Sequence, residues 1–143
     1  MKGLRQSDYR ALAEFRHRIR RFLIASEEAA RKSGIEPQQY LCMLSLQGLP
    51  AGEAPTVGTV AERLLLRHHS AVELVDRLER RGLVRRARGE LDRREVWIRL
   101  TPRGVRMLER LARKRFTELR ASGPELVRAL AALVAATRRA RSV

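Results

Sequence analysis

The stretch TVAERLLLRHHSAVELVDRLERRGLVRR, from Thr59 to Arg86, decides the fold of this chain. Thr59 with Glu62 at the N3 position fits a capping box, which predicts that a short helix begins here. Leu65–His68 is then expected to form a turn. A second helix follows, and its apolar face recurs at helical spacing, with Ala71, Leu74, Val75 and Leu78. Gly82 is expected to end this helix as a left-handed cap, so the stretch predicts a helix-turn-helix.

The residues that follow the helix-turn-helix have strand-like composition. LVRRA (Leu83–Ala87) and EVWIRLT (Glu95–Thr101) place apolar residues in near alternation with polar ones. Between them, RGELDRR (88–94) is a polar connection of hairpin length that contains glycine. A helix-turn-helix followed directly by a basic hairpin predicts a winged helix, whose second helix enters the major groove of DNA while the hairpin lies against an adjacent groove or the backbone.

Further helices are expected on both sides of this lobe. Apolar residues at helical spacing predict a long helix from about Asp8 to Lys32, ended by Gly34, and a second that starts near Pro37. Pro102 is expected to open another helix, which ASGP (121–124) breaks before a last one ending near Arg139. The fold class is therefore mainly α (α+β), a winged helix-turn-helix lobe flanked by N- and C-terminal helices. The expected bounds within one domain, 1–143, are 37–103 for the lobe, near 84–100 for the wing, and 8–33 and 105–141 for the flanking helices.

Composition narrows the function. The chain has 143 residues, of which 44% are hydrophobic, and its net charge of +15 favours a polyanionic partner, with nucleic acid as the first candidate. No apolar run approaches about 18 residues, so neither a transmembrane helix nor a membrane partner is expected. The N-terminus lacks the apolar stretch of a secretory signal. Cys42 is the only cysteine, which excludes an internal disulfide and suits a cytoplasmic location.

Several motifs resemble the MarR family of bacterial transcriptional regulators. LVDRLERRGLV (Leu74–Val84) matches that family's recognition helix and its glycine stop, Asp92-Arg93-Arg94 matches the Asp-x-Arg of the wing, and IRLTPRG (Ile98–Gly104) matches the exit from the wing. The resemblance implies a homodimer formed through the terminal helices, which binds pseudo-palindromic double-stranded DNA in the bacterial nucleoid. Many such proteins respond to small aromatic ligands, so a small-molecule effector is a candidate partner.

The wing supplies the first candidate DNA contacts. Arg94 at its tip is suited to enter a narrow minor groove or to hold a phosphate, with Asp92 positioning it. The alternative is an ordinary salt bridge on a solvated hairpin, which stabilises little. Arg88 and Arg93 are expected phosphate contacts. For the neighbouring pair Arg85-Arg86 the question stays open, because alternate strand residues face opposite ways.

The second helix carries the other candidates. Glu73 has two accounts: it completes a capping box with Ser70, or it accepts a hydrogen bond from a cytosine amino group. Asp76 and Glu79 are expected to pair with Arg80 at helical spacing. The full set of expected DNA-contacting residues is Arg67, His68, His69, Ser70, Glu73, Arg77, Arg88, Asp92, Arg93 and Arg94.

The adjacent pair His68-His69 raises the question of a metal site. Neighbouring residues on a helix point about 100° apart, so the two rings do not readily share one ion. Zinc takes three or four protein ligands, and the only other histidine, His17, is distant in sequence. Contact with the DNA backbone or a base edge is the preferred interpretation, and a pH-dependent phosphate contact is an alternative.

The remaining candidates favour packing over chemistry. Cys42 lies within an apolar pattern and is expected to be a small buried residue rather than a redox sensor. Trp97 is expected on one face of the wing, against the lobe. We find no nucleophile–base pair, phosphate loop or closed metal set, so the sequence predicts no enzyme, no cofactor and no metal. The expected function is sequence-specific DNA binding by a homodimeric repressor, and the alternative is a non-specific nucleic-acid-binding or architectural protein.

Overall fold

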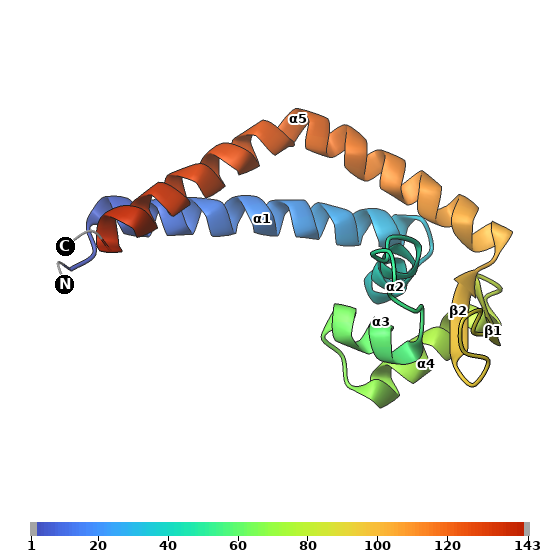
Figure 1. The fold of residues 1–143 in the computed structure, drawn as a ribbon. Helices are drawn as coiled ribbons and strands as arrows, with labels where there is room; N and C mark the ends of the chain where they lie inside the picture. The colour runs from blue at the N-terminus through green and yellow to red at the C-terminus, as the bar shows by residue number, and fades with distance from the viewer. Residues whose placement is uncertain (1–2, 142–143) are drawn as a thin grey trace. The chain divides into compact units, whose positions relative to one another are not determined.

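The computed structural model describes residues 3–141. These residues form five helices and a two-stranded sheet (Figure 1). They divide into two compact units. The central unit is residues 30–112, and the terminal unit consists of the described residues of 1–29 and 113–143. No helix among the described residues has the length and apolar character needed to cross a membrane.

The first two helices follow the sequence prediction closely. α1 spans Gln6–Lys32 and ends where Gly34 takes φ +79°, with its N–H bonded to the Arg31 carbonyl and that of Ile35 to the Ala30 carbonyl. These two bonds form a Schellman cap, which requires the left-handed backbone that glycine adopts without strain. α2 spans Pro37–Gln47, so the expected first-turn position of its proline is confirmed.

α3 spans Val57–Leu64, and its cap differs from the predicted one. The N-cap is Thr56, whose hydroxyl accepts a hydrogen bond from the Thr59 N–H at 3.2 Å. The predicted start at Thr59 is therefore wrong, because an earlier threonine already satisfies the free amides of the first turn. Leu65 ends the helix with φ 55°, a left-handed conformation unusual for leucine, and its side chain is 92% exposed.

α4 spans His68–Arg80 and is the second helix of the helix-turn-helix. Its N-cap is Arg67, which makes no side-chain capping bond, and Ser70 lies inside the first turn. The capping box proposed for Ser70 and Glu73 is therefore wrong, because the helix starts before Ser70. At the other end the prediction for Gly82 is confirmed: it has φ +70°, and its N–H bonds to the Glu79 carbonyl.

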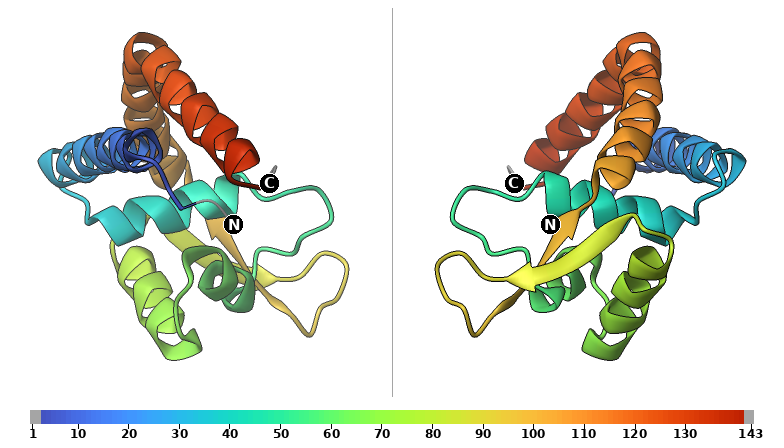
Figure 2. Two further views of the ribbon diagram at one scale, coloured as in Figure 1. Left: turned by 90° about the vertical axis from the view of Figure 1, so that its left-hand side faces the viewer. Right: turned by 90° about the vertical axis from the view of Figure 1, so that its right-hand side faces the viewer.

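The predicted hairpin is confirmed as two antiparallel strands, β1 (Val84–Arg88) and β2 (Val96–Leu100). Their register pairs Val84 with Leu100 and Arg88 with Val96. The N–H of Ile98 donates to the Pro55 carbonyl at 2.7 Å, which ties the second strand to the segment before α3. Figure 2 shows the loop between the strands projecting away from the helices of the central unit. We call β1, β2 and this loop the wing.

α5 runs from Pro102 to Arg141 as one helix of 40 residues, so the break predicted at 121–124 is wrong. Figure 1 shows that α5 is bent, and Pro124, which lies inside this helix and lacks an N–H, accounts for a bend without ending the helix. The residue before a proline normally avoids helical geometry because its Cβ meets the proline ring. Here that residue is Gly123, which has no Cβ, so the helix continues.

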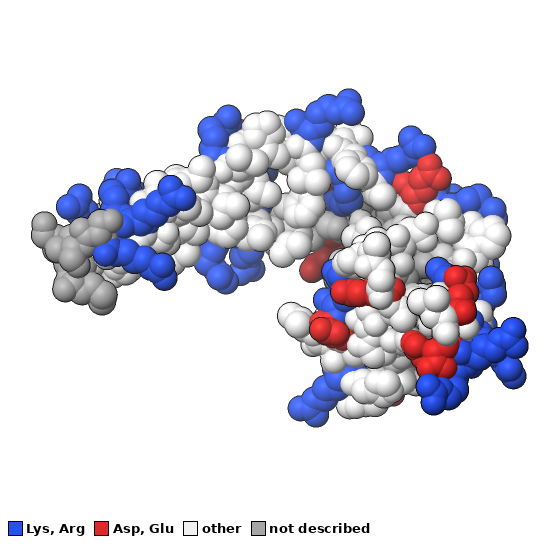
Figure 3. Space-filling model, in the orientation of Figure 1, with Lys and Arg blue, Asp and Glu red and all other residues white. Residues whose placement is uncertain are grey.

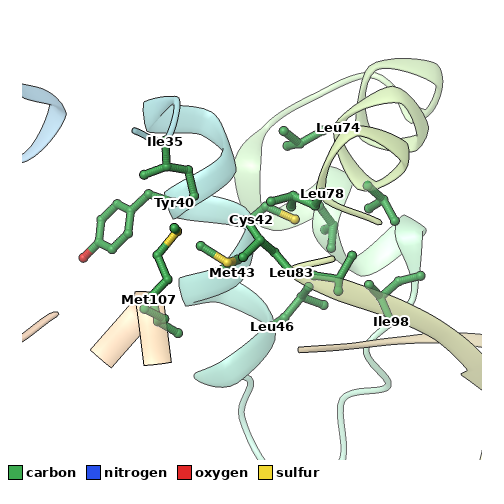
Figure 4. Close-up of a cluster of buried hydrophobic side chains, with 14 of the residues drawn as sticks. Ile35, Tyr40, Cys42, Met43, Leu46, Leu74, Leu78, Leu83, Ile98 and Met107 are labelled. Atoms are coloured by element: carbon green, nitrogen blue, oxygen red, sulfur yellow. The ribbon is translucent and has the colours of Figure 1, made fainter. Parts of the chain in front are cut away.

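The hydrophobic core lies in the central unit, where α2, α3, α4, the wing and the start of α5 meet (Figure 4). Its fully buried side chains include Met43, Leu78, Leu83 and Ile98. Cys42 is also fully buried in this core, as predicted, and burial raises the pKa of its thiol to about 12. A packed core of this kind fixes α4 and the wing as parts of one body.

Candidate nucleic-acid interface

α4 presents a polar face opposite its buried one. Leu74, Val75 and Leu78 pack into the core. His69, Glu73 and Arg77 follow one another at four-residue intervals, so they share one side of the helix, and all three are exposed. Within residues 3–141 the side chains of Glu73 and Arg77 form no hydrogen bond or ion pair, so both are available to a partner.

The start of α4 adds further exposed polar groups. Arg67, His68 and His69 are exposed, and Ser70 is half-buried. The first intrahelical bond runs from the Ala71 N–H to the Arg67 carbonyl, at 3.1 Å. The N–H groups before it point out of the helix end, which favours anions such as phosphate. The structure thus places four of the predicted residues at a helix end suited to phosphate.

At the wing tip, Asp92 holds Arg94 through three contacts. Its Oδ1 accepts from the Arg94 backbone N at 3.0 Å and from Nε at 3.1 Å, while Oδ2 accepts from Nη2 at 3.1 Å. These hydrogen bonds from Arg94 lower the pKa of Asp92. The Arg94 side chain nevertheless remains 91% exposed. The geometry contains both features expected from the sequence, a hairpin ion pair and a solvent-facing guanidinium held in a fixed orientation.

The loop of the wing packs closely against Gly89 and Trp97. A Cβ on Gly89 would lie 2.3 Å from the Asp92 carbonyl oxygen and 2.8 Å from Nε1 of Trp97, so only glycine fits there. Trp97 is 6% exposed and Arg99 stacks on its ring at 5.0 Å, which agrees with the prediction that it lies on one face of the wing. Arg99 also pairs with Glu90 at 2.9 Å. These contacts define the shape of the loop that carries Asp92 and Arg94.

Helical spacing predicts that Asp76 and Glu79 of α4 pair with Arg80, and this prediction is wrong. Both instead bind Arg86 of β1: Nη2 lies 2.6 Å from Asp76 Oδ1, and Nη1 lies 2.7 Å from Glu79 Oε1. Partial burial of the guanidinium lowers the pKa of Arg86, but the bonds and attraction from Asp76 and Glu79 outweigh it and the pKa is raised. The cross-element pairing wins because Arg86 can reach both carboxylates at once. Sequence spacing within one helix carried no signal for it.

Arg81, which the sequence analysis did not single out, joins the end of α4 to neighbouring turns. Its Nη1 donates to Gln39 Oε1 at 2.9 Å and its Nη2 to the Gly34 carbonyl at 2.7 Å. Its own carbonyl accepts a bond from Arg103 at 3.2 Å. These contacts hold the C-terminal end of α4 against the end of α1 and the start of α5.

The predicted site residues thus form two exposed groups in the central unit. Eight of them are exposed, and Ser70 and Asp92 are half-buried. The first group lies on α4 and consists of Arg67, His68, His69, Ser70, Glu73 and Arg77; the second lies on the wing and consists of Arg88, Asp92, Arg93 and Arg94. Figure 3 shows basic side chains gathered around the wing, with acidic ones beside them.

Comparison with known proteins identifies the family. A MarR family model matches residues 33–95. The HTH-type transcriptional regulator YsmB of Bacillus subtilis is 31% identical over 93 residues, which are 65% of this chain and 62% of that relative, so the chain spans a little under two thirds of its length. The structure of a MarR family protein from Bacillus stearothermophilus is 31% identical, with 78% of each chain covered and a TM-score of 0.60. CouR from Rhodococcus jostii, solved with bound p-coumaroyl-CoA, is 28% identical over 68% of this chain and 67% of CouR, with a TM-score of 0.60. On this identity and coverage, and with the winged helix-turn-helix in place, the chain belongs to the MarR family of transcriptional regulators.

Proposed function

We propose that this protein is a cytoplasmic, sequence-specific double-stranded DNA-binding repressor that acts as a homodimer. The observation that carries the proposal is the pair of exposed polar groups on α4 and the wing, fixed to a common core. Glu73 and Arg77 on α4 would read base edges in the major groove, while Arg94 enters the adjacent minor groove and Arg93 binds phosphate.

The terminal unit supports dimerisation. Among its described residues only one hydrophobic side chain, Ala136, is buried. Large apolar side chains are instead exposed along both helices of the unit: Leu12 (47%), Leu23 (50%), Phe116 (73%), Val127 (67%) and Leu130 (45%). A second copy of the same unit would cover these faces and give them a shared core. Two recognition helices would then meet half-sites about 34–36 Å apart.

Release of DNA by a small molecule is the regulatory part of the proposal. CouR, at 28% identity, was solved with p-coumaroyl-CoA. The terminal unit here contains a hollow of about 320 Å³, bordered by Phe22, Leu126, Arg18 and Ser122 among others. A mainly apolar hollow with a few polar groups is the usual form of a site for a small aromatic ligand.

The test is selection of duplexes from a randomised DNA pool by the purified protein, followed by affinity measurements on a selected duplex and a scrambled one. We expect enrichment of a two-fold-symmetric sequence and clearly weaker binding of the scrambled duplex. Arg94→Ala should weaken binding of the selected duplex about tenfold or more and should lower its salt dependence. Arg10→Ala, which removes an exposed arginine of the terminal unit, is the matched control and should change the affinity little.

The main alternative is non-specific nucleic-acid binding, and the arginine-rich wing favours it as the second candidate. It predicts equal affinity for the selected and scrambled duplexes at every salt concentration. Sedimentation of the free protein tests the dimer separately, since a monomer at micromolar concentration would contradict that part of the proposal.

A further inference from the structure

Arg86 and the two carboxylates that bind it form a clamp between the recognition helix and the wing. Besides its guanidinium contacts with Asp76 and Glu79, Arg86 donates its backbone N–H to Glu79 Oε2 at 3.1 Å. Glu79 therefore holds both the side chain and the main chain of the same strand residue. We call these three residues the clamp.

The clamp occupies the face of β1 that is turned towards α4. Arg85, its neighbour in the strand, is exposed, whereas the Arg86 side chain is only 29% exposed. Alternate strand residues face opposite ways, so Arg85 and Arg86 cannot serve the same surface. Arg86 has both of its terminal nitrogens committed to carboxylates, which makes it a poor candidate for phosphate contact.

Val84 and Ile98 already anchor the wing in the shared core, and the clamp matters because it adds directional polar contacts to this packing. The chain passes from α4 to β1 through the turn at Gly82 and Leu83, and β2 is tied to the lobe by the bond from Ile98 to Pro55. The clamp adds a link between the last two turns of α4 and the middle of β1. Charge-assisted bonds with fixed geometry, made twice by one planar guanidinium, restrict rotation better than a single ion pair.

We propose that Arg86 is a positioning residue that, through Asp76 and Glu79, sets the orientation of the wing relative to the recognition helix, so that both elements meet their grooves in one register. The inference rests on the proposed function, because it assigns a role in reading DNA. Asp76 and Glu79 are then required for selective binding although they are acidic residues on a DNA-facing unit.

This role leads to an expectation opposite to that of simple electrostatics. Replacing both carboxylates removes two negative charges from a protein that binds a polyanion, which by charge alone would tighten binding to every duplex. Loss of the clamp would instead loosen the wing and weaken binding to the selected sequence. The sign of the effect on the selected duplex therefore separates the two accounts.

The experiment compares wild type with Asp76→Ala/Glu79→Ala, using a duplex selected by the wild-type protein and its scrambled version. Alanine suits both positions because they lie within a helix. We expect affinity for the selected duplex to fall about tenfold or more, while affinity for the scrambled duplex is unchanged or rises. Glu62→Ala on α3 is the control: it removes an exposed carboxylate of the same unit outside the clamp and should not weaken binding to either duplex.

Two further measurements keep the inference open to refutation. Arg86→Ala should lose about as much affinity as the double variant, and the triple variant should lose no more, because all three residues act as one unit. Amide hydrogen exchange of the free protein should show faster exchange of the Arg86 N–H in the double variant, since its acceptor is gone.

The outcomes separate the inference from the proposed function. If the folded double variant binds the selected duplex as tightly as wild type or more tightly, the clamp has no positioning role. If the wild-type protein prefers no DNA sequence, the proposed function fails. Independently of that result, an unchanged exchange rate of the Arg86 amide in the double variant would show that the clamp does not hold the strand.

Discussion

Gly104→Ala should destabilise the central unit, although alanine is normally the better helix residue. A Cβ at this position would lie 2.1 Å from the carbonyl oxygen of Leu83 and 3.0 Å from its carbonyl carbon. Both are backbone atoms and cannot rotate away. The same oxygen accepts the Thr101 N–H at 3.0 Å, and the Leu83 side chain is fully buried, so a shift there disturbs both a hydrogen bond and the core.

The expected size follows from these contacts. Weakening the hydrogen bond costs about 1 kcal/mol, and moving a core residue costs about 1–3 kcal/mol. The gain in helix propensity from glycine to alanine is about 1 kcal/mol. The net loss of unfolding free energy is therefore about 1–3 kcal/mol, or a fall of several degrees in Tm.

Urea unfolding followed by circular dichroism measures this change. Gly58→Ala in α3 is the matched control, because the nearest atom to its Cβ is the Thr56 hydroxyl at an ordinary 3.7 Å. That variant should be neutral or slightly stabilising. If the unfolding free energies of Gly104→Ala and the control changed equally to within about 0.5 kcal/mol, α5 would not approach Leu83 as closely as the structure shows.

Three other predictions concern single residues. Leu65→Gly should stabilise the protein by about 0.5–1 kcal/mol in urea unfolding, because glycine removes the backbone strain of a left-handed leucine whose side chain is 92% exposed. Leu65→Ala keeps the unfavourable φ and should not stabilise the protein. Equal effects of the two substitutions would contradict the strain at this position. Cys42 should resist iodoacetamide in the native state up to mildly alkaline pH and react only after unfolding, because burial raises the pKa of its thiol to about 12, and rapid native alkylation would disprove its burial. Asp92 should titrate below the ordinary range of an aspartate in a carboxyl-detected NMR experiment, because the hydrogen bonds from Arg94 lower its pKa. The stabilisation from this pair is thus present at neutral pH and lost only as the pH falls through that lowered value. Arg94→Ala should return the midpoint to the ordinary range, and an unshifted midpoint would show that the pair does not persist in solution.

The elements predicted correctly are those whose signals are local. Gly82 could be assigned as a left-handed cap because few other residues adopt that backbone readily, and the alternation in 84–100 indicated the wing for a similar reason. The start of α3 is ambiguous in the sequence, because Thr56 and Thr59 can each act as an N-cap and only the structure shows that Thr56 does. Pro124 by itself predicts a break in α5, and the helix continues because the residue before it, Gly123, has no Cβ to meet the proline ring.

The candidate site was predictable to a different extent. Exposure of Arg94 and Arg93 followed from a polar hairpin tip, which local pattern describes well. The pairing of Arg86 with Asp76 and Glu79 could not be predicted from local pattern. These carboxylates come close to Arg86 only after the turn at Gly82 reverses the chain. Contacts across elements depend on tertiary geometry, and a pairing rule based on helical spacing therefore chose Arg80 instead.

Trp97 is the only tryptophan of the chain, which makes the wing optically distinguishable from the rest of the protein. Its indole is buried, and its Nε1 has no hydrogen-bond partner among residues 3–141. An indole in such dry surroundings fluoresces at shorter wavelength than one in water, and the stacked Arg99 guanidinium lies next to the wing loop. Any partner that displaces Arg99 or opens the loop would change that emission. The protein thus contains a natural fluorophore in the wing, where we propose that it contacts DNA, and its emission can be followed in the unmodified chain without a label.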